Sequence, residues 1–393
     1  MRRFPDYLGV TAFGVKMGVV LPGDDIIEEV YRVVERCFRD GLIDDGDVIC
    51  VKENVVARAQ NNIVSKDEIA QDLKKKLNLD ENSTLGILFP IASRNRFAPI
   101  LEGFAKVVRT GRVVVQFSYP HDCVGNQLVP EDLDETLNKD LTVDEVTHDE
   151  LMKIDFKHPA TGVNYIKLYT SIIEAGGAKA QIFLSNNPKK ILDYNPDGIV
   201  VSCIHERFKV LNKIRKVFNN VITLQDILND PRGRAWSEWG LLGSNVYSND
   251  LIKLAPREAF EVAKKIQRRI QEGIGKKVEV MVYGDGAYLD PATMIYELAD
   301  PVCSFGHTEG LTKRREGIKF KYFVGMLSAQ GRSREEIEKI IESERRKKYE
   351  IDDYSMEGTT PRRLSDVVAS LADLVSGSAD AGTPVVIVKG FFK

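Results

Sequence analysis

Hydrophobic and polar positions follow two different spacings in the first part of the chain. Apolar residues three and four apart predict a helix over 26–38, after the turn LPGDD. Short apolar runs at 48–51, 86–89 and 113–117 predict buried strands, and a helix is expected over 97–108 between the last two. Strands that alternate with helices in this way are typical of an α/β or α+β core.

The pattern changes in the middle of the chain. Three short apolar runs, at 181–184, 198–203 and 220–223, are separated by helical spacings, and this order predicts a small parallel α/β layer. The layer contains no glycine-rich phosphate loop of the GxGxxG or GxxxxGK[ST] type. We therefore expect three segments: the N-terminal part of a core over 1–150, an inserted α/β layer over 151–275, and the C-terminal part of the core over 276–393.

Other elements follow from local signals. Helices are expected over 256–272 and 361–375, and the apolar run at 278–283 predicts a buried strand between them. Ser65, with Glu68 three residues later, has the pattern of a capping box and predicts a helix start. Taken together, the elements predict a mixed fold, part α+β and part α/β.

Composition narrows the class of protein. Hydrophobic residues make up 43% and charged residues 29% of the 393 residues, which is typical of a soluble globular protein. The formal net charge is −3, so no nucleic-acid partner is expected. No run approaches the roughly 18 apolar residues of a membrane helix, and no signal peptide is evident, so we expect a cytoplasmic protein without a membrane partner. The five cysteines are scattered, which argues against a disulfide framework or a zinc site.

Carboxylates gather after the strand predicted at 278–283. The strand ends in Gly284-Asp285-Gly286, which leaves backbone room around Asp285, and Asp290 and Asp300 follow. Mg²⁺ and Mn²⁺ prefer such oxygen ligands. A turn explains Asp285 equally well, and helix capping or termination explains Asp290 and Asp300. Spacing alone leaves both interpretations open.

Two further loops carry polar residues just beyond predicted strands. In SYPHDCVGNQLV, Asp122 is a candidate metal ligand and Asn126 a candidate contact for a base edge or a phosphate, although turn hydrogen bonds also explain both residues. In VKENVVARAQNN, Lys52, Glu53 and Asn54 follow a strand. Arg58 lies four residues beyond Asn54, where a cation would suit phosphate groups.

Basic residues follow the acids. His307 is a candidate acid–base group beside them. A polyanionic substrate and a solvated basic face both explain the cluster. Its members are Lys313, Arg314, Arg315, Lys319 and Lys321.

Both ends of the chain are similar to one known family. The N-terminal part carries PGDDI, a helix, and then GLIDDGDVICVKENVVARAQ. The C-terminal part carries LSDVVASLADLVSGSADAGTPVVIVKG, which is a helix, a small-residue turn and a strand. The order and spacing of these elements resemble the coenzyme F-420:L-glutamate ligases.

This resemblance implies an unusual α+β fold, a homodimer, and a reaction that uses GTP and a divalent metal, Mg²⁺ or Mn²⁺. Glu53 and Asn54 fall where that family contacts nucleotide, and Arg58 falls where it has a lysine. Asp122 and Asn126 resemble its Asp-x-Ser-Asn motif, with one extra residue of spacing. Asp285 resembles the metal-binding aspartate at a strand end, although the Asp-Thr-x-Gly-Arg pattern that follows is absent.

The resemblance therefore predicts a GTP-dependent amide ligase that joins an amino acid, L-glutamate, to a carboxylate through an acyl phosphate. Asp285, Asp122 and His307 are the predicted catalytic residues. Asp122, Asp285, Asp290 and Asp300 are the predicted metal ligands. The acceptor stays open among a deazaflavin coenzyme, a folate or pterin, and a peptide terminus. Two alternatives remain: a nucleotide- and metal-binding protein of the same fold without turnover, and a metal-dependent phosphohydrolase.

Overall fold

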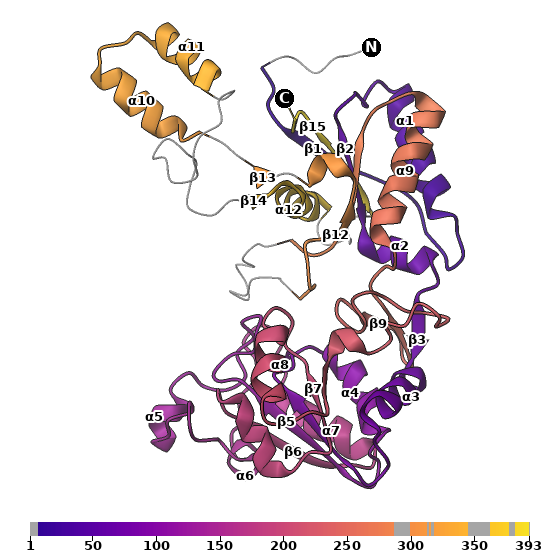
Figure 1. Ribbon diagram of the computed structural model, residues 1–393, viewed down its shortest axis with the longest axis vertical. Helices are drawn as coiled ribbons and strands as arrows, with labels where there is room; N and C mark the ends of the chain where they lie inside the picture. The colour runs from indigo at the N-terminus through magenta and orange to yellow at the C-terminus, as the bar shows by residue number, and fades with distance from the viewer. Residues whose placement is uncertain are drawn as a thin grey trace.

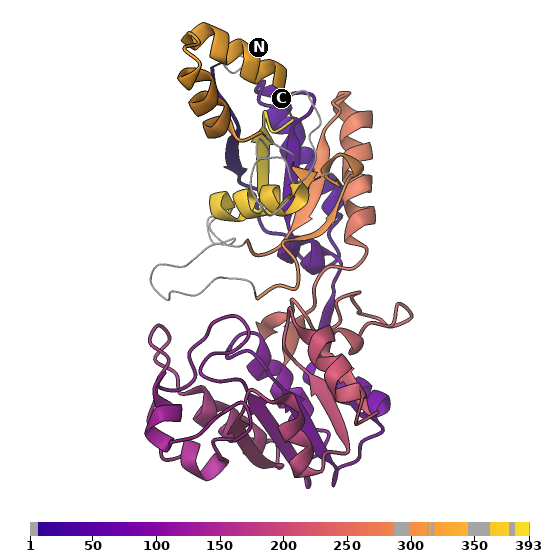
Figure 2. The same cartoon turned by 60° about the vertical axis from the view of Figure 1, so that its left-hand side comes forward.

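The computed structural model describes residues 7–286, 299–312, 314–315, 318–344, 362–376 and 382–392. These residues form two lobes, each built around a five-stranded sheet, with a small third sheet at the junction (Figures 1 and 2). The fold is mixed α/β, as the sequence predicts.

The sheet of the upper lobe joins the two ends of the chain. Its strand order is β1-β15-β2-β11-β12. Only β2 and β11 are parallel within it, and their register pairs Val48 with Glu279 and Lys52 with Tyr283. Parallel strands end at the same edge of a sheet, so the residues that follow β2 and β11 emerge side by side. The strands are β1 (Thr11–Val15), β2 (Val48–Lys52), β11 (Glu279–Tyr283), β12 (Ser304–His307) and β15 (Val385–Lys389).

Helices cover both faces of this sheet. α1 (Ile26–Arg39) and α9 (Ala259–Ile274) pack on one face, and α12 (Leu364–Ser376) packs on the other. The side chain of Asp25 caps α1 by accepting hydrogen bonds from the backbone N–H groups of Ile27 and Glu28. All five residues of β2 are buried because the sheet is covered on both sides.

The lower lobe is a doubly wound parallel sheet with the order β6-β5-β4-β7-β8. The chain runs outward from β4 through β5 to β6, and then returns to the other side of β4 for β7 and β8. The strand order therefore reverses between β4 and β7. The predicted segment boundary at residue 150 lies inside this layer. The strands are β4 (Thr84–Leu88), β5 (Arg112–Phe117), β6 (Lys179–Leu184), β7 (Gly198–Val201) and β8 (Val221–Thr223).

The two faces of this parallel sheet bury separate hydrophobic clusters. One face is covered by α3 (Lys66–Leu77), α4 (Phe97–Ala105) and α7 (Tyr165–Ala175). The other face is covered by the 3-10 helix η1 (Pro188–Tyr194) and by α8 (Arg207–Arg215). The predicted capping box at the start of α3 is confirmed, because Ser65 and Glu68 bond each other's backbone N–H groups.

A short helix and a small sheet connect the lobes. α2 (Glu53–Ala59) follows β2 directly, and β3 (Ile63–Ser65) then pairs with β10 (Leu251–Lys253), which pairs with β9 (Asn245–Ser248). Trp239 packs against the hydrophobic clusters of both lobes. Trp239 thus forms an apolar contact between the two lobes.

The remaining elements lie at the periphery. α5 (Leu133–Leu137) and α6 (His148–Leu151) flank the parallel sheet, and β13 (Arg314–Arg315) pairs with β14 (Arg362–Arg363). α10 (Phe320–Ala329) and α11 (Arg334–Glu344) form a helical pair that projects from the upper lobe (Figure 1). In the described part of the chain, no helix is long and apolar enough to cross a membrane.

Candidate active site

Lys52 is the centre of a charged cluster at the edge where β2 and β11 end. Its side chain is only 4% exposed. The ammonium donates to Asp373 Oδ1 at 2.6 Å and to the carbonyl of Gly284 at 3.1 Å, and it lies 3.4 Å from Asp285 Oδ1. A buried ammonium is costly unless it is paired, and these acceptors supply the pairing.

Asp373 belongs to α12, which covers the face of the upper sheet opposite to α1 and α9. Its carboxylate is fully buried, and Oδ2 accepts a hydrogen bond of 2.8 Å from the backbone N–H of Gly286. Asp373 therefore fixes both the lysine and the start of the segment that follows β11. This residue was not predicted. The available signal was an acid within the buried stripe of α12, where Ala369, Ala372 and Ser376 are also buried.

Arg96 reaches the same cluster from the lower lobe. It lies just before α4, at the end of the loop that follows β4. Its Nη1 donates to Asp300 Oδ1 at 2.7 Å and its Nη2 donates to Asp285 Oδ2 at 2.5 Å. The other oxygen of Asp300 accepts from the backbone N–H of Asp285 at 2.9 Å. The predicted pair Asp285 and Asp300 is thus brought together, around an arginine that no local pattern in the sequence identifies.

The cluster shifts the pKa values of its members. Burial, together with the neighbouring carboxylate of Asp300, raises the pKa of Asp285 to about 6. Burial acts in the same direction on Asp300, but the Arg96 guanidinium outweighs it and holds the pKa of Asp300 below its usual range. Burial opposes the charged form of Lys52, but Asp285 and Asp373 outweigh it and raise the pKa of the lysine. Lys52 and Arg96 therefore remain cations.

A second buried ion pair adjoins the cluster. Lys253 Nζ, from β10 at the junction, lies 2.7 and 3.0 Å from the two carboxylate oxygens of Glu53 at the start of α2. Burial raises the pKa of Glu53, and the charge of Lys253 opposes this rise. Glu53, a predicted nucleotide contact, is therefore already paired within the protein.

Asn54 and Arg58 lie four residues apart on α2, so they share one face of the helix. Asn54 Oδ1 and Arg58 Nε are both buried, and neither has a hydrogen-bond partner among the described residues. An acceptor and a donor that are buried without partners are costly in a folded protein. The two predicted nucleotide contacts therefore offer the kind of unmet bonding capacity that a ligand would satisfy.

Asp122 and Asn126 lie at the carboxyl edge of the lower sheet and bond each other. Asp122 Oδ1 accepts from the backbone N–H groups of Val124 and Asn126, and Oδ2 accepts from Asn126 Nδ2 at 2.7 Å. Oδ2 also accepts from the backbone N–H of Ala92 at 2.7 Å. These contacts shape the loop that carries Arg96, and none of the partners belongs to the acidic cluster. Burial raises the pKa of Asp122.

His307 lies on β12 opposite Met281, four residues before Asp285 along the neighbouring strand. Four strand residues span about 13 Å, so His307 is placed away from the acids. Its ring packs edge-on against Phe260, 5.2 Å away between centroids. The structure therefore does not bring this predicted catalytic group to Asp285.

Some of the predicted residues lie outside the part of the chain that the structure describes. Asp290 and Lys313 are outside the described residues, and of Arg314 and Arg315 only the backbone is described, within β13. Lys319 caps α10 and Lys321 lies within it, on the peripheral helical pair. These two basic residues therefore belong to α10, whereas Asp285 follows β11.

The carboxylates of the acidic cluster are already bonded within the protein. The oxygens of Asp285, Asp300 and Asp373 each face a protein donor, and the Arg96 guanidinium stands between the first two carboxylates. Among the described residues, no group of three or more histidine, cysteine or acidic side chains is arranged to hold a metal by itself. Two protein carboxylates are enough for Mg²⁺ or Mn²⁺ when a phosphate supplies other ligands, so the donor set suits such an ion once the arginine moves away.

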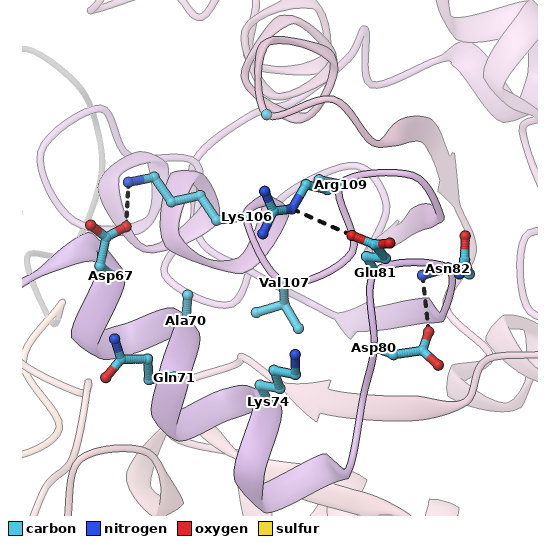
Figure 3. Close-up of a pocket in the computed structure, with 11 residues that line it drawn as sticks. Asp67, Ala70, Gln71, Lys74, Asp80, Glu81, Asn82, Lys106, Val107 and Arg109 are labelled. Atoms are coloured by element: carbon cyan, nitrogen blue, oxygen red, sulfur yellow. Dashed lines mark hydrogen bonds and ion pairs between the residues drawn. The ribbon is translucent and has the colours of Figure 1, made fainter.

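A wider cleft elsewhere has a different character. It has a volume of about 770 Å³ and lies between α3, the 80–82 turn and the residues that follow α4 (Figure 3). Four of its charged side chains form two pairs: Lys106 contacts Asp67 at 2.6 Å, and Arg109 lies 3.8 Å from Glu81. The cleft also lies near the amino ends of β4 and β5, whereas ligands of open parallel sheets bind at the carboxyl ends.

Comparison with known proteins places these observations in a family. No curated protein matches the chain. The model of the family described as F420-0:Gamma-glutamyl ligase matches residues 14–390, which is nearly the whole chain and includes both lobes. The resemblance first noted at the two ends of the sequence therefore extends through the parallel layer, and the chain belongs to the F420-0:gamma-glutamyl ligase family.

Proposed function

We propose that this protein is a GTP- and divalent-metal-dependent amide ligase that adds L-glutamate to a carboxylate of a coenzyme-like acceptor. Family membership supports a ligase. The acceptor named in the family description, F420-0, is the first candidate. GTP, the metal and glutamate are part of the proposal.

One observation carries it: two lobes meet at a buried cluster of three carboxylates and two cations. Asp285, Asp300 and Asp373 face Lys52 and Arg96 within hydrogen-bond distance. Such a cluster is what the transfer of a phosphoryl group needs, because charge must be neutralised where it builds up on phosphate oxygens. The acids Asp285 and Asp300 would hold the metal, and Lys52 would face the phosphates as a point charge.

The reaction balances in two steps. A carboxylate oxygen of the acceptor attacks the γ-phosphorus of GTP, the bond to the β-phosphate oxygen breaks, and GDP leaves. The glutamate nitrogen then attacks the acyl carbon, inorganic phosphate leaves, and the nitrogen loses a proton. The metal, Mg²⁺ or Mn²⁺, would supply charge neutralisation at the phosphates. Asn54 and Arg58, with their unpartnered buried atoms, would hold the nucleotide.

A second candidate has an observation in its favour. The carboxylate oxygens that a metal would need all face donors within the protein. A nucleotide-binding protein of the same fold without turnover would keep this self-neutralised arrangement, because it does not need open carboxylate oxygens. A phosphohydrolase has no comparable observation here, but it is tested by the same assay.

The assay incubates purified protein with GTP, MnCl₂, L-glutamate and F420-0. The expected result is an acceptor product heavier by one glutamyl residue, with stoichiometric phosphate release that depends on glutamate. Asp300→Asn should abolish the product, whereas Asp250→Asn, at an 87% exposed carboxylate, should leave it unchanged. Phosphate release without an amine would identify a phosphohydrolase, and nucleotide binding without either product would identify a binding protein; each result would overturn the ligase.

A further inference from the structure

Arg96 connects the two lobes by charge. The residue belongs to the lower lobe, at the end of the loop after β4, and its guanidinium contacts Asp285 and Asp300 of the upper lobe at 2.5 and 2.7 Å. The side chain is 19% exposed, and both acids are less exposed than that. One planar group thus serves two carboxylates with two different nitrogens, a geometry that lysine cannot provide.

Hydrogen bonds hold the backbone of the loop that carries Arg96. The Tyr169 hydroxyl donates to the carbonyl of Ile91 at 2.6 Å and accepts from the backbone N–H of Ser93 at 3.0 Å. The Ser93 hydroxyl in turn accepts from the backbone N–H of Arg96 at 3.1 Å. With the bond from Ala92 to Asp122, these contacts fix the backbone, so the conformation of Arg96 can change through its side chain alone.

Arg96 also lies at the point where the strand order of the lower sheet reverses. Open α/β sheets bind ligands at the carboxyl ends of the strands beside such a point. In this protein the space there measures only about 20 Å³, with Ile91, Arg96, Ser202 and Ala299 among its walls. That is room for about one water molecule. Arg96 is thus one of the residues that line this narrow space.

The charges around Arg96 are not balanced. Asp285, Asp300 and Asp373 carry three negative charges when ionised, and Lys52 and Arg96 carry two positive charges. Without Arg96, the remaining four side chains would carry a net charge of −2. A divalent cation between Asp285 and Asp300 would neutralise that charge, and it would occupy the place of the guanidinium.

We propose that Arg96 is a latch that competes with a divalent cation for Asp285 and Asp300. The cation binds when the arginine side chain leaves the two carboxylates. The identity of the cation rests on the proposed function. The binding of a cation at this place rests on the proposed function as well, and the structure supplies its competitor, because Arg96 already occupies one oxygen of each carboxylate.

Titration of the protein with MnCl₂ in the absence of nucleotide tests this competition, with bound Mn²⁺ measured by calorimetry and by loss of the free-ion signal in electron paramagnetic resonance. Arg96→Ala should bind Mn²⁺ roughly 5- to 150-fold more tightly than the unmodified protein, the range expected for one coupled interaction. Arg96→Lys keeps the charge but loses the two-nitrogen geometry, so its affinity for Mn²⁺ should lie between those of the unmodified protein and Arg96→Ala. Arg94→Ala removes an exposed arginine from the same loop and should have no effect.

Removal of the latch leaves two buried acids without their partner, so Arg96→Ala should gain thermal stability from Mn²⁺. If that variant fails to fold without metal, its recovery on refolding in MnCl₂ supports the latch, and Arg96→Gln provides a second folded variant. Folded Arg96 variants that bind Mn²⁺ no more tightly than the unmodified protein would overturn it. These measurements contain no GTP, so tighter Mn²⁺ binding without ligase product would sustain the latch and reject only the proposed function.

Discussion

Lys52 shows what burial demands of a single charged residue. Its ammonium lies 5.1 Å from the centre of the Tyr283 ring and is bonded to Asp373, so it has lost nearly all of its water. The carboxylates around it keep its pKa above the usual range. The lysine therefore stays charged at neutral pH, and its removal would leave Asp373 without its lysine partner.

Lys52→Met should accordingly lower the free energy of unfolding by roughly 3–5 kcal/mol, the cost of breaking a buried pair. Urea unfolding measures this change. A second substitution, Asp373→Asn, should recover part of the loss because the unpaired charge is then absent. Lys264→Met, at an exposed lysine paired with Glu261, should change stability by no more than about 0.5 kcal/mol. A loss below about 1 kcal/mol for Lys52→Met would show that Asp373 has another source of stabilisation.

At the scale of elements, the loops after the strands of the lower sheet set the position of the site. Asp122 follows β5 and bonds the loop that follows β4, so two neighbouring strand ends are tied together by one carboxylate. Asp122→Ala should remove these hydrogen bonds and lower stability by roughly 2–4 kcal/mol, because buried N–H groups lose their acceptors. Asp155→Ala, at an exposed acid of the same lobe, is the matched control.

The same variant tests the prediction that Asp122 is a metal ligand. If the carboxylate serves the loop, Asp122→Ala should retain Mn²⁺ affinity or increase it, because the loop that holds Arg96 is loosened. Calorimetry with MnCl₂ distinguishes the roles. Lost Mn²⁺ binding with unchanged stability would make Asp122 a ligand.

The segment before α6 carries a pH-dependent contribution. Hydrogen bonds from Lys139 lower the pKa of Glu150 to about 2, and Glu150 also accepts bonds from Thr147 at the start of the helix. A pKa that is depressed in the folded state stabilises the protein above the unfolded value of 4.5 and loses this effect as the pH falls toward 2. The side chain is 31% exposed, so solvent screening limits the contribution to about 1 kcal/mol.

Glu150→Gln should therefore destabilise the protein at pH 6 by about that amount and have progressively less effect as the pH falls below 4.5. Chemical unfolding at several pH values between 6 and 3 measures the difference. A difference that is constant across this range would mean that the charge of Glu150 does not contribute.

Local sequence signals predicted many of the helices and strands. They could not predict the order of the strands in the sheets or the partners of the buried charges, which depend on residues far apart in the sequence. The helix predicted over 26–38, the capping box at Ser65 and the strands predicted at 181–184 and 198–203 each depend on residues close in sequence, and the structure confirms them. The partners of β4 are β5 and β7, which no local pattern specifies. Arg96 and Asp373 meet Asp285 only because two lobes and a distant helix converge, so the sequence identified Asp285 and Asp300 and missed Arg96 and Asp373.

For the whole molecule, the junction between lobes is polar at the site and apolar around it. Trp239 packs edge-on against Phe305, 6.0 Å away between centroids, and the buried pair of Glu53 and Lys253 joins α2 to the junction sheet. Lys253→Met should lower the free energy of unfolding by roughly 3–5 kcal/mol, because Glu53 would remain buried without its partner. The double variant with Glu53→Gln should be more stable than Lys253→Met alone, as measured by urea unfolding. A double variant that is less stable would show that Glu53 is held by other contacts.

The central claim is that the converging acids form a cation site of a GTP-dependent ligase. Crystals grown with MnCl₂ and a non-hydrolysable GTP analogue, with data collected at a wavelength where manganese scatters anomalously, test it most directly. The account predicts a manganese peak between Asp285 and Asp300, with the Arg96 side chain turned away and the phosphates near Lys52. Bound nucleotide with Arg96 still on both carboxylates, and manganese elsewhere or absent, would contradict it.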